Sequence, residues 1–426
     1  MTLLVISPDF ISHYSPLAVV ARAAKQAGRR VVFATGVNMA PHVQAEGFEW
    51  QLLQLSQSAN SGIAAQNPAI TRFLNATREG ALATIRCQAL DREKDLLWQP
   101  VEVAKQIAQL CDKLDPDDIL VDHISFGSTL GVYATGRSFT TLIPGHPSQL
   151  PVGTERYGIP AVWPSCMQPK AADLARQEDV TDRVTAKFTA RWNAALQEIA
   201  PVMTPVKDAF RVHGNQVLYN SPAHYHSAER SMYLPPKHAF VGPLIREEVL
   251  APHYQQWLDA NDDRPTIYVA LGTFLSHRGD VLGKLSTALQ HANVKVAMAI
   301  GANPMSGFEP VPKGWLIEAS LPQVGLLKEC DLIIHHGGNN SVQEALGMGV
   351  RQIILPFSTD QFANATDLER AKLATVVSPN DICITTFTQL IKDALGLPKP
   401  KALLPVSAEL LVSTLPGRQV AKRVNK

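Results

Sequence analysis

The amino-acid sequence predicts an α/β protein made of two doubly wound domains, each built around a parallel sheet. The chain has 426 residues. One hydrophobic core rarely serves so long a chain, so two domains of about 200 residues each are expected. Short apolar runs alternate with helical patterns in both halves, as they do where helices connect parallel strands. A polar stretch rich in Pro and Asp, residues 244–263, separates the halves and is the expected linker.

The expected strands form one set in residues 1–243 and a second set in residues 264–426. The first set consists of LLVIS, RVVFATG, DDILVDH, TTLIP and QVLYN. The second set consists of TIYVALGT, VKVAMAIG, GWLIEA, DLIIHH, RQIILP and ATVVSP. The least regular stretches, roughly residues 54–73 and 147–182, are expected to form long loops, and such loops often shape a binding site. The C-terminal RQVAKRVNK is expected to be a solvated helix end.

Composition and charge exclude several classes of protein. The formal net charge is +1, and no basic run precedes the last residues, so nothing indicates a nucleic-acid surface. Five cysteines are scattered without metal-ligand spacing, which favours a reduced cytoplasmic protein without structural zinc. The start MTLLVISPDF lacks a basic leader, and no run of about 18 apolar residues appears, so we expect neither export nor a membrane span. The oligomeric state stays open.

The segment from Asp331 to Ala365 carries the strongest functional signal. It reads DLIIHHGGNNSVQEALGMGVRQIILPFSTDQFANA, in which a short strand is followed by a glycine turn and a helix start. Gly337 and Gly338 allow the backbone to turn close to a ligand. The helix that follows would present free N–H groups to a diphosphate, and His336 at the turn could donate to phosphate oxygens.

At this point the sequence resembles the nucleotide-sugar-dependent glycosyltransferases of the UDP-glycosyltransferase type, which are family 1-like enzymes with the GT-B fold. Their signature runs PQ, HxGxNSxxE, P and DQxxNA. It stands here as Pro322-Gln323, His336 to Glu344, Pro356, and Asp360 to Ala365. The VGPL and WLD pieces before the TIYVALGT strand extend the resemblance over nearly the whole chain.

The resemblance implies two Rossmann-like domains that face each other across a cleft. Residues 1–243 would bind the acceptor and residues 264–426 the sugar donor, with the last helix packing back on the first domain. The donor site would comprise Gly272, Thr273, Ser320, Leu321, Gln323, His336, Gly338, Asn340, Ser341, Glu344, Asp360 and Gln361.

Several of these residues also have a purely structural explanation. Glu344 matches the carboxylate that binds the ribose, but Ser341 and Glu344 also have capping-box spacing. Asp360 and Gln361 match the pair that reads sugar hydroxyls, but Ser358 and Gln361 have the same spacing. Gly272 and Thr273 match a phosphate-binding turn and could equally form a tight turn between a strand and a helix.

The nucleobase position departs from the family pattern. The family usually has an aromatic ring two places before the PQ pair, and this chain has Ser320 there. Backbone groups or a ring from elsewhere, Trp315 or Phe274, would then hold the base.

The expected catalytic pair is His13 with Asp122. His13 is predicted to lie in the loop before a helix that Ser15 caps and Pro16 opens, and it matches the family's GHxxP histidine. Asp122 ends a strand and matches the carboxylate that orients that histidine. The structural alternatives are a solvent-facing histidine and a strand-end cap. His123 is a weaker candidate, because adjacent residues on a strand point to opposite faces.

These expectations describe an inverting glycosyltransferase. It would move a hexose, most simply glucose, from a UDP-sugar to a hydroxyl of a small, largely apolar acceptor such as a phenolic, macrolide or terpenoid natural product. No metal ion or cofactor is expected, because a helix N-terminus, His336 and backbone N–H groups could balance the diphosphate charge.

Other functions stay open at this stage. A dTDP-sugar donor or a lipid acceptor is possible within the same reaction class, although no membrane-binding patch is evident. A nucleotide-sugar epimerase and a non-catalytic partner of the same fold are less favoured, because His13, Asp122 and the Asp360-Gln361 pair are all present.

Overall fold

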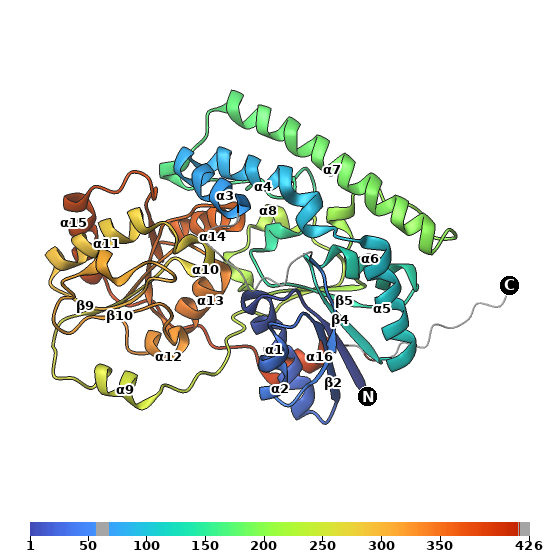
Figure 1. Cartoon of the computed structure of the whole chain (residues 1–426), viewed down its shortest axis with the longest axis horizontal. Helices are drawn as coiled ribbons and strands as arrows, with labels where there is room; N and C mark the ends of the chain where they lie inside the picture. Colours follow the sequence, from blue (N-terminus) through green and yellow to red (C-terminus); the bar gives the residue numbers. More distant parts are fainter. Residues whose placement is uncertain (57–67, 416, 418–426) are drawn as a thin grey trace.

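The computed structural model describes residues 1–56, 68–415 and 417. As predicted, two α/β domains each contain a parallel sheet (Figure 1). The first sheet has seven strands in the order β3-β2-β1-β4-β5-β6-β7, and the second has six in the order β10-β9-β8-β11-β12-β13. In each sheet the order reverses beside the first strand, between β1 and β4 and between β8 and β11. Ligands of doubly wound proteins bind at such switch points, outside the carboxyl ends of the strands.

The first sheet contains all five expected strands and two more, β3 and β7. Its strands are β1 (Thr2–Ile6), β2 (Arg30–Thr35), β3 (Glu49–Leu52), β4 (Asp118–Asp122), β5 (Thr140–Ile143), β6 (Gln216–Tyr219) and β7 (His238–Phe240). The two additional strands are short and lie at the sheet edges, where half-exposed residues give no continuous apolar run. Alternate residues of β1 face opposite layers: Leu3 and Val5 pack with α1, and Leu4 and Ile6 pack with α5.

Helices cover both faces of the first sheet. They are α1 (Ile11–Gln26), α2 (Ala40–Ala45), α3 (Pro68–Glu79), α4 (Ala81–Leu96), α5 (Pro100–Leu114), α6 (Phe126–Ala134), α7 (Ala171–Ile199) and α8 (Ala228–Ser231). The expected loops over residues 54–73 and 147–182 are shorter than predicted, because α3 begins at Pro68 and α7 at Ala171. Proline is well tolerated in a first helical turn, and AADLARQE at the start of α7 is rich in good helix formers. The rest of the first loop, residues 57–67, lies outside the described residues.

The second sheet contains all six expected strands. They are β8 (Thr266–Ala270), β9 (Lys295–Ala299), β10 (Leu316–Glu318), β11 (Leu332–His335), β12 (Arg351–Ile354) and β13 (Ala374–Val376). The helices around them are α10 (Gly272–Leu275), α11 (Gly279–Ala292), α12 (Gln323–Leu327), α13 (Asn339–Met348), α14 (Thr359–Arg370) and α15 (Ile384–Leu395). The start of α13 follows β11 directly, and the start of α14 follows β12, so both helix N-termini lie at the carboxyl edge of the sheet.

The chain crosses between the domains twice. Residues 241–265 make the first crossing and include α9 (Pro252–Leu258). After α15 the chain returns, and α16 (Ala408–Ser413) packs beside α1 of the first domain, where Leu411 and Leu415 join its apolar core (Figure 1). The backbone N–H of Gly417 then donates to Asp118 at 2.9 Å. The tail RQVAKRVNK lies outside the described residues. No helix in the described part of the chain has the length and apolarity to cross a bilayer.

Candidate active site

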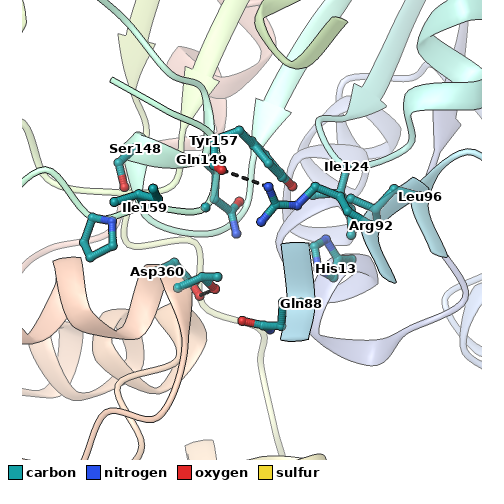
Figure 2. A pocket seen from close by; sticks show the side chains of 13 residues that line it. His13, Gln88, Arg92, Leu96, Ile124, Ser148, Gln149, Tyr157, Ile159 and Asp360 are labelled. Carbon is teal, nitrogen blue, oxygen red and sulfur yellow. Dashed lines mark hydrogen bonds between the residues drawn. The ribbon is translucent and has the colours of Figure 1, made fainter. Parts of the chain in front are cut away.

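A cavity of about 310 Å³ lies where the first domain meets the start of α14 (Figure 2). We call it the interdomain cavity. Its lining comes from α1, α4, the segment after β4, the loop after β5, and α14. The lining residues are His13, Gln88, Arg92, Leu96, Ile124, Ser148, Gln149, Tyr157, Gly158, Ile159, Pro160, Thr359 and Asp360.

His13 lies in the first turn of α1, which corrects the expectation that it belongs to a loop. The helix begins at Ile11, so Ser15 and Pro16 are inside it and do not cap or open it. Proline lacks an N–H, and Pro16 therefore leaves the carbonyl of Ser12 without its usual helical donor. The side-chain amide of Asn340 in the second domain donates to that carbonyl at 2.9 Å. A proline that the sequence pattern assigns to the helix start thus frees an acceptor for a contact between the domains.

Asp122 holds the ring of His13. His13 Nδ1 and Asp122 Oδ2 are 2.8 Å apart, and Oδ1 of the same fully buried carboxylate accepts the backbone N–H of Ile124 at 3.0 Å. Burial opposes protonation of His13, but the charge and hydrogen bond of Asp122, with the charge of Asp360, outweigh it and raise the pKa of His13 above its ordinary value. With Nδ1 engaged, Nε2 is the nitrogen left for a ligand.

His123 takes no part in this pair. Its Nε2 lies 2.8 Å from the carbonyl oxygen of Gln149, and burial lowers the pKa of His123 to about 4. The side chain is a buried, neutral member of the loop packing.

The Asp360-Gln361 pair at the start of α14 divides into two roles. Asp360 lines the interdomain cavity, and burial raises its pKa against the opposing charges of His146 and His13. The side-chain oxygen of Gln361 instead accepts the backbone N–H groups of Phe357 and Ser358, at 2.9 and 3.2 Å. The capping box between Ser358 and Gln361 is present, so the structural alternative is confirmed for Gln361. Its amide nitrogen remains for a ligand.

Glu344 is a buried carboxylate on α13. Gln323 Nε2 donates to Glu344 Oε2 at 2.5 Å and to Ser341 Oγ at 3.0 Å. Burial raises the pKa of Glu344 to about 7, although the Arg246 charge and the Gln323 hydrogen bond oppose the rise. The capping-box explanation of Ser341 and Glu344 is wrong, because α13 begins at Asn339 and has Gly338 at its N-cap.

The turn before α13 is built around the ring of His336. Gly272 has a φ of +74°, and a Cβ there would lie 2.8 Å from that ring. A Cβ on Gly338 would lie 2.3 Å from His336 Nε2. Gly272 is therefore required by its left-handed backbone and by the space that His336 occupies. Burial lowers the pKa of His336 to about 4, against a hydrogen bond to the backbone of Ala270 that raises it. The ring is therefore neutral, and the one nitrogen that can donate is directed at Ala270. The side chain of Thr273 lies outside the described part of the chain.

Ser320 and Leu321, the two residues that the sequence places beside the nucleobase, differ in exposure. Ser320 is exposed, whereas Leu321 is buried against Tyr268 and Leu326. Trp315 packs in the core, where its Nε1 donates to the carbonyl of Val294 at 3.0 Å, so it is not available for stacking.

Phe274 is 40% exposed, and its ring meets that of Phe10 in the first domain with centroids 6.3 Å apart. Of the two rings proposed to replace the missing aromatic residue, Phe274 alone remains a candidate.

Two important side chains escaped the sequence prediction. Asn339 is buried, and its amide donates to the carbonyls of Pro144 and Asn220 in the first domain, both at 2.8 Å. Asn339 stands in the HHGGNNS motif, but its partners are almost 200 and 120 residues away in sequence, so the motif could not reveal its role. Arg92 enters the interdomain cavity from α4, which has no recognisable motif.

Comparison with known proteins agrees with this architecture. Residues 284–398 match the family model described as the C-terminal domain of erythromycin biosynthesis protein CIII-like proteins. NDP-glycosyltransferase YjiC of Bacillus subtilis (strain 168) is 27% identical over 155 residues, 36% of this chain and 38% of the relative. Demethyllactenocin mycarosyltransferase of Streptomyces fradiae is 25% identical over 202 residues, 47% of this chain and 43% of the relative. The match thus spans less than half the length of these relatives.

Solved structures resemble the whole chain. The glycotransferase of kitacinnamycin superposes with a TM-score of 0.68 at 17% identity, covering 97% of this chain and 93% of the other. Glycosyltransferase VinC in complex with DTDP gives a TM-score of 0.64 at 17% identity, covering 97% and 95%.

The two facing parallel-sheet domains are therefore those of the GT-B fold. Within that fold, the family-model match over residues 284–398 and the curated relatives confirm the resemblance to family 1-like glycosyltransferases that was found in the sequence.

Proposed function

We propose that this chain is an inverting glycosyltransferase. It would move a hexose, with glucose as the first candidate, from a UDP-sugar to a hydroxyl of a small, largely apolar acceptor. The observation that carries the proposal is the pairing of His13 with buried Asp122 in a cavity that Asp360 enters from the second domain. One domain thereby supplies a base and the other a group that can accept hydrogen bonds from a sugar. The activities named for the relatives, all sugar transfers, support this reaction class.

The proposed reaction is a direct displacement. The acceptor hydroxyl gives its proton to His13 Nε2, and Asp122 stabilises the resulting imidazolium. The acceptor oxygen bonds to the anomeric carbon while the bond from that carbon to the diphosphate breaks on the opposite face, which inverts the centre. The free N–H groups at the N-terminus of α13 would stabilise the leaving diphosphate. This set needs no metal ion or cofactor, and EDTA should leave the rate unchanged.

The choice of donor depends on Glu344. A carboxylate can accept from both vicinal hydroxyls of a ribose, whereas a deoxyribose offers one. Glu344 therefore favours a UDP-sugar, with a dTDP-sugar as the alternative that the VinC complex suggests. A donor panel of UDP- and dTDP-sugars with mixed phenolic, macrolide and terpenoid acceptors, read by mass gain, tests donor and acceptor together.

The base assignment has its own test. His13→Ala should lower transfer by about 10²–10⁴-fold, the usual contribution of general-base catalysis. The affinity for UDP should stay at the wild-type level, because the base acts on the acceptor. An equal loss of UDP affinity would show that His13 holds the donor and is not the base.

A further inference from the structure

Arg92 is a buried cation that lines the interdomain cavity. It lies on α4 with 4% of its surface exposed, and its NH1 donates to the carbonyl of Tyr157 at 2.9 Å. The guanidinium carbon is 4.7 Å from the ring centroid of Tyr157 and 5.7 Å from that of Phe210. Figure 2 shows the guanidinium beside Gln149 and Tyr157, in the same cavity as His13. These contacts fix the plane of the guanidinium and leave part of its donor fork turned to the cavity.

The charge of Arg92 has no carboxylate partner among the described residues. Arginine is almost never fully buried without one. The other two arginines that are buried in the described part of the chain follow that rule, since Arg29 pairs with Asp118 and Arg278 with Asp280. Burial lowers the pKa of Arg92, and among the described residues Tyr157 opposes this. The cavity therefore contains a positioned cation whose charge the described part of the protein leaves uncompensated.

We propose that Arg92 binds a carboxylate of the acceptor, so that the acceptors are small hydroxy acids. This inference rests on the proposed glycosyl transfer and adds the substrate class. A planar guanidinium fork matches a carboxylate in geometry and charge. Leu96, Ile124 and Ile159 in the same lining would pack against the apolar body of such a molecule.

The size and charge of the cavity limit the choice further. A volume of about 310 Å³ stands at the lower end of small-molecule sites, which favours an acceptor with one or two rings over a macrolide. A phosphate would bring a second negative charge into a lining whose only Arg or Lys is Arg92 and which also contains Asp360. A carboxylate on Arg92, with the acceptor hydroxyl at His13 Nε2, satisfies both groups.

Matched acids and esters test this inference. The probes are 4-hydroxycinnamate, 4-hydroxyphenylacetate and mandelate, each beside its methyl ester, which keeps the hydroxyl and removes the charge. Binding is measured by calorimetric titration in the presence of UDP, and transfer by mass gain with UDP- and dTDP-glucose. For at least one pair, the wild type should favour the acid by about 10- to 100-fold in Kd and in kcat/KM, the contribution of a charged hydrogen bond. The product should be a glycoside on the hydroxyl, stable to mild alkali.

Two variants assign the preference to Arg92. Arg92→Gln should bind acid and ester equally, and Arg92→Lys should recover part of the preference, since it keeps the charge but loses the fork. Arg86→Gln is the matched control, because Arg86 is an exposed arginine on the same helix and outside the interdomain cavity. It should keep the wild-type preference. UDP affinity should be the same in all three.

Three results would overturn the inference: equal binding of acid and ester by the wild type in every pair, a preference that survives Arg92→Gln, or a sugar attached to the carboxylate. Acid binding that depends on Arg92, without transfer from any donor, would leave the carboxylate site standing and reject the proposed function. Transfer to esters and acids alike would do the reverse.

Discussion

His13 owes its chemical character to one neighbour. Asp122 is fully buried, and its Oδ2 lies 2.8 Å from Nδ1 of His13. Its charge and hydrogen bond raise the pKa of His13, so His13 can act as a base only at a pH above that raised pKa. Replacing the Asp122 carboxylate with an amide should have two consequences for His13. The imidazolium formed during transfer loses its stabilising charge, and the ring gives up its proton more readily before the reaction.

Asp122→Asn should therefore lower kcat and shift the acidic limb of the pH–rate profile to lower pH. The limb reports the pH at which His13 loses its proton, and removal of a negative charge lowers that pKa. The measurement is kcat/KM from pH 5 to pH 9, with UDP affinity as the control. An unchanged limb would mean that Asp122 does not set the protonation of the base.

Glu344 provides a proton-linked signal of donor binding. Its pKa of about 7 in the free protein means that near pH 6.5 it is largely protonated. Ribose hydroxyls that donate to the carboxylate favour its ionised form. Binding of UDP-glucose, whose phosphates do not titrate near neutrality, should release a proton from this group.

Calorimetric titrations of UDP-glucose at pH 6.5 in buffers of different ionisation enthalpy would detect that release. Glu344→Gln should abolish it and weaken binding by about 1–3 kcal/mol, the cost of a lost or unpaired polar contact. If the variant bound UDP-glucose as the wild type does and still exchanged a proton, the ribose assignment to Glu344 would be refuted.

His13, Asp122 and Asp360 come from three separate elements that lie far apart in sequence. Each could be proposed from the sequence because it stands at the start or end of its element, where side chains reach the carboxyl edge of a sheet. Arg92 could not be found this way, because it lies inside α4 and is distinguished by burial without a carboxylate partner among the described residues. That property depends on packing.

At the scale of single elements, helix starts account for most differences between expectation and structure. The sequence rule places proline in the first turn and Ser or Thr at the cap, and α1 breaks both parts of it. In α14 the capping rule holds. The side-chain oxygen of Gln361 accepts backbone N–H groups in the capping box, so it is not available to bind a sugar hydroxyl. The same four-letter spacing fails in α13, because Gly338 already occupies the cap position. Spacing alone does not show where a helix begins.

Gln361 and Asp360 should consequently respond differently to substitution. Gln361→Ala removes the capping acceptor of two backbone N–H groups and should destabilise the protein by about 0.5–2 kcal/mol. Asp360→Asn keeps the shape of its side chain and should mainly lower kcat/KM, with the sugar of the donor held less well. Urea unfolding and transfer kinetics on both variants separate the roles. A stability loss confined to Asp360→Asn would contradict this division.

Over the whole molecule, the alternation of apolar runs and helices was sufficient to predict both sheets. Two short edge strands of four and three residues, β3 and β7, lie outside that alternation. The arrangement of the domains depends on contacts between residues far apart in sequence, such as Trp163 with Phe362 and His146 with Asp367. No local pattern contains that information, so the cavity between the domains could be inferred only from the resemblance to a family.

The interface offers a last prediction, because two adjacent asparagines contact the first domain in different surroundings. Asn339 is buried and supplies donors to two carbonyls, whereas Asn340 supplies one donor to Ser12 at the exposed edge. Asn339→Ala leaves the carbonyls of Pro144 and Asn220 buried without that donor, and it should cost about 1–3 kcal/mol.

Asn340→Ala is the matched comparison and should cost much less, because water can replace the amide at an exposed acceptor. The midpoint of urea unfolding measures the difference, and small-angle scattering shows whether the domains separate. Asn339→Ala should also lower kcat/KM, since His13 and Asp360 come from opposite domains, while the donor site within the second domain keeps its affinity for UDP. Equal midpoints for the two variants would show that the buried contact does not hold the domains together.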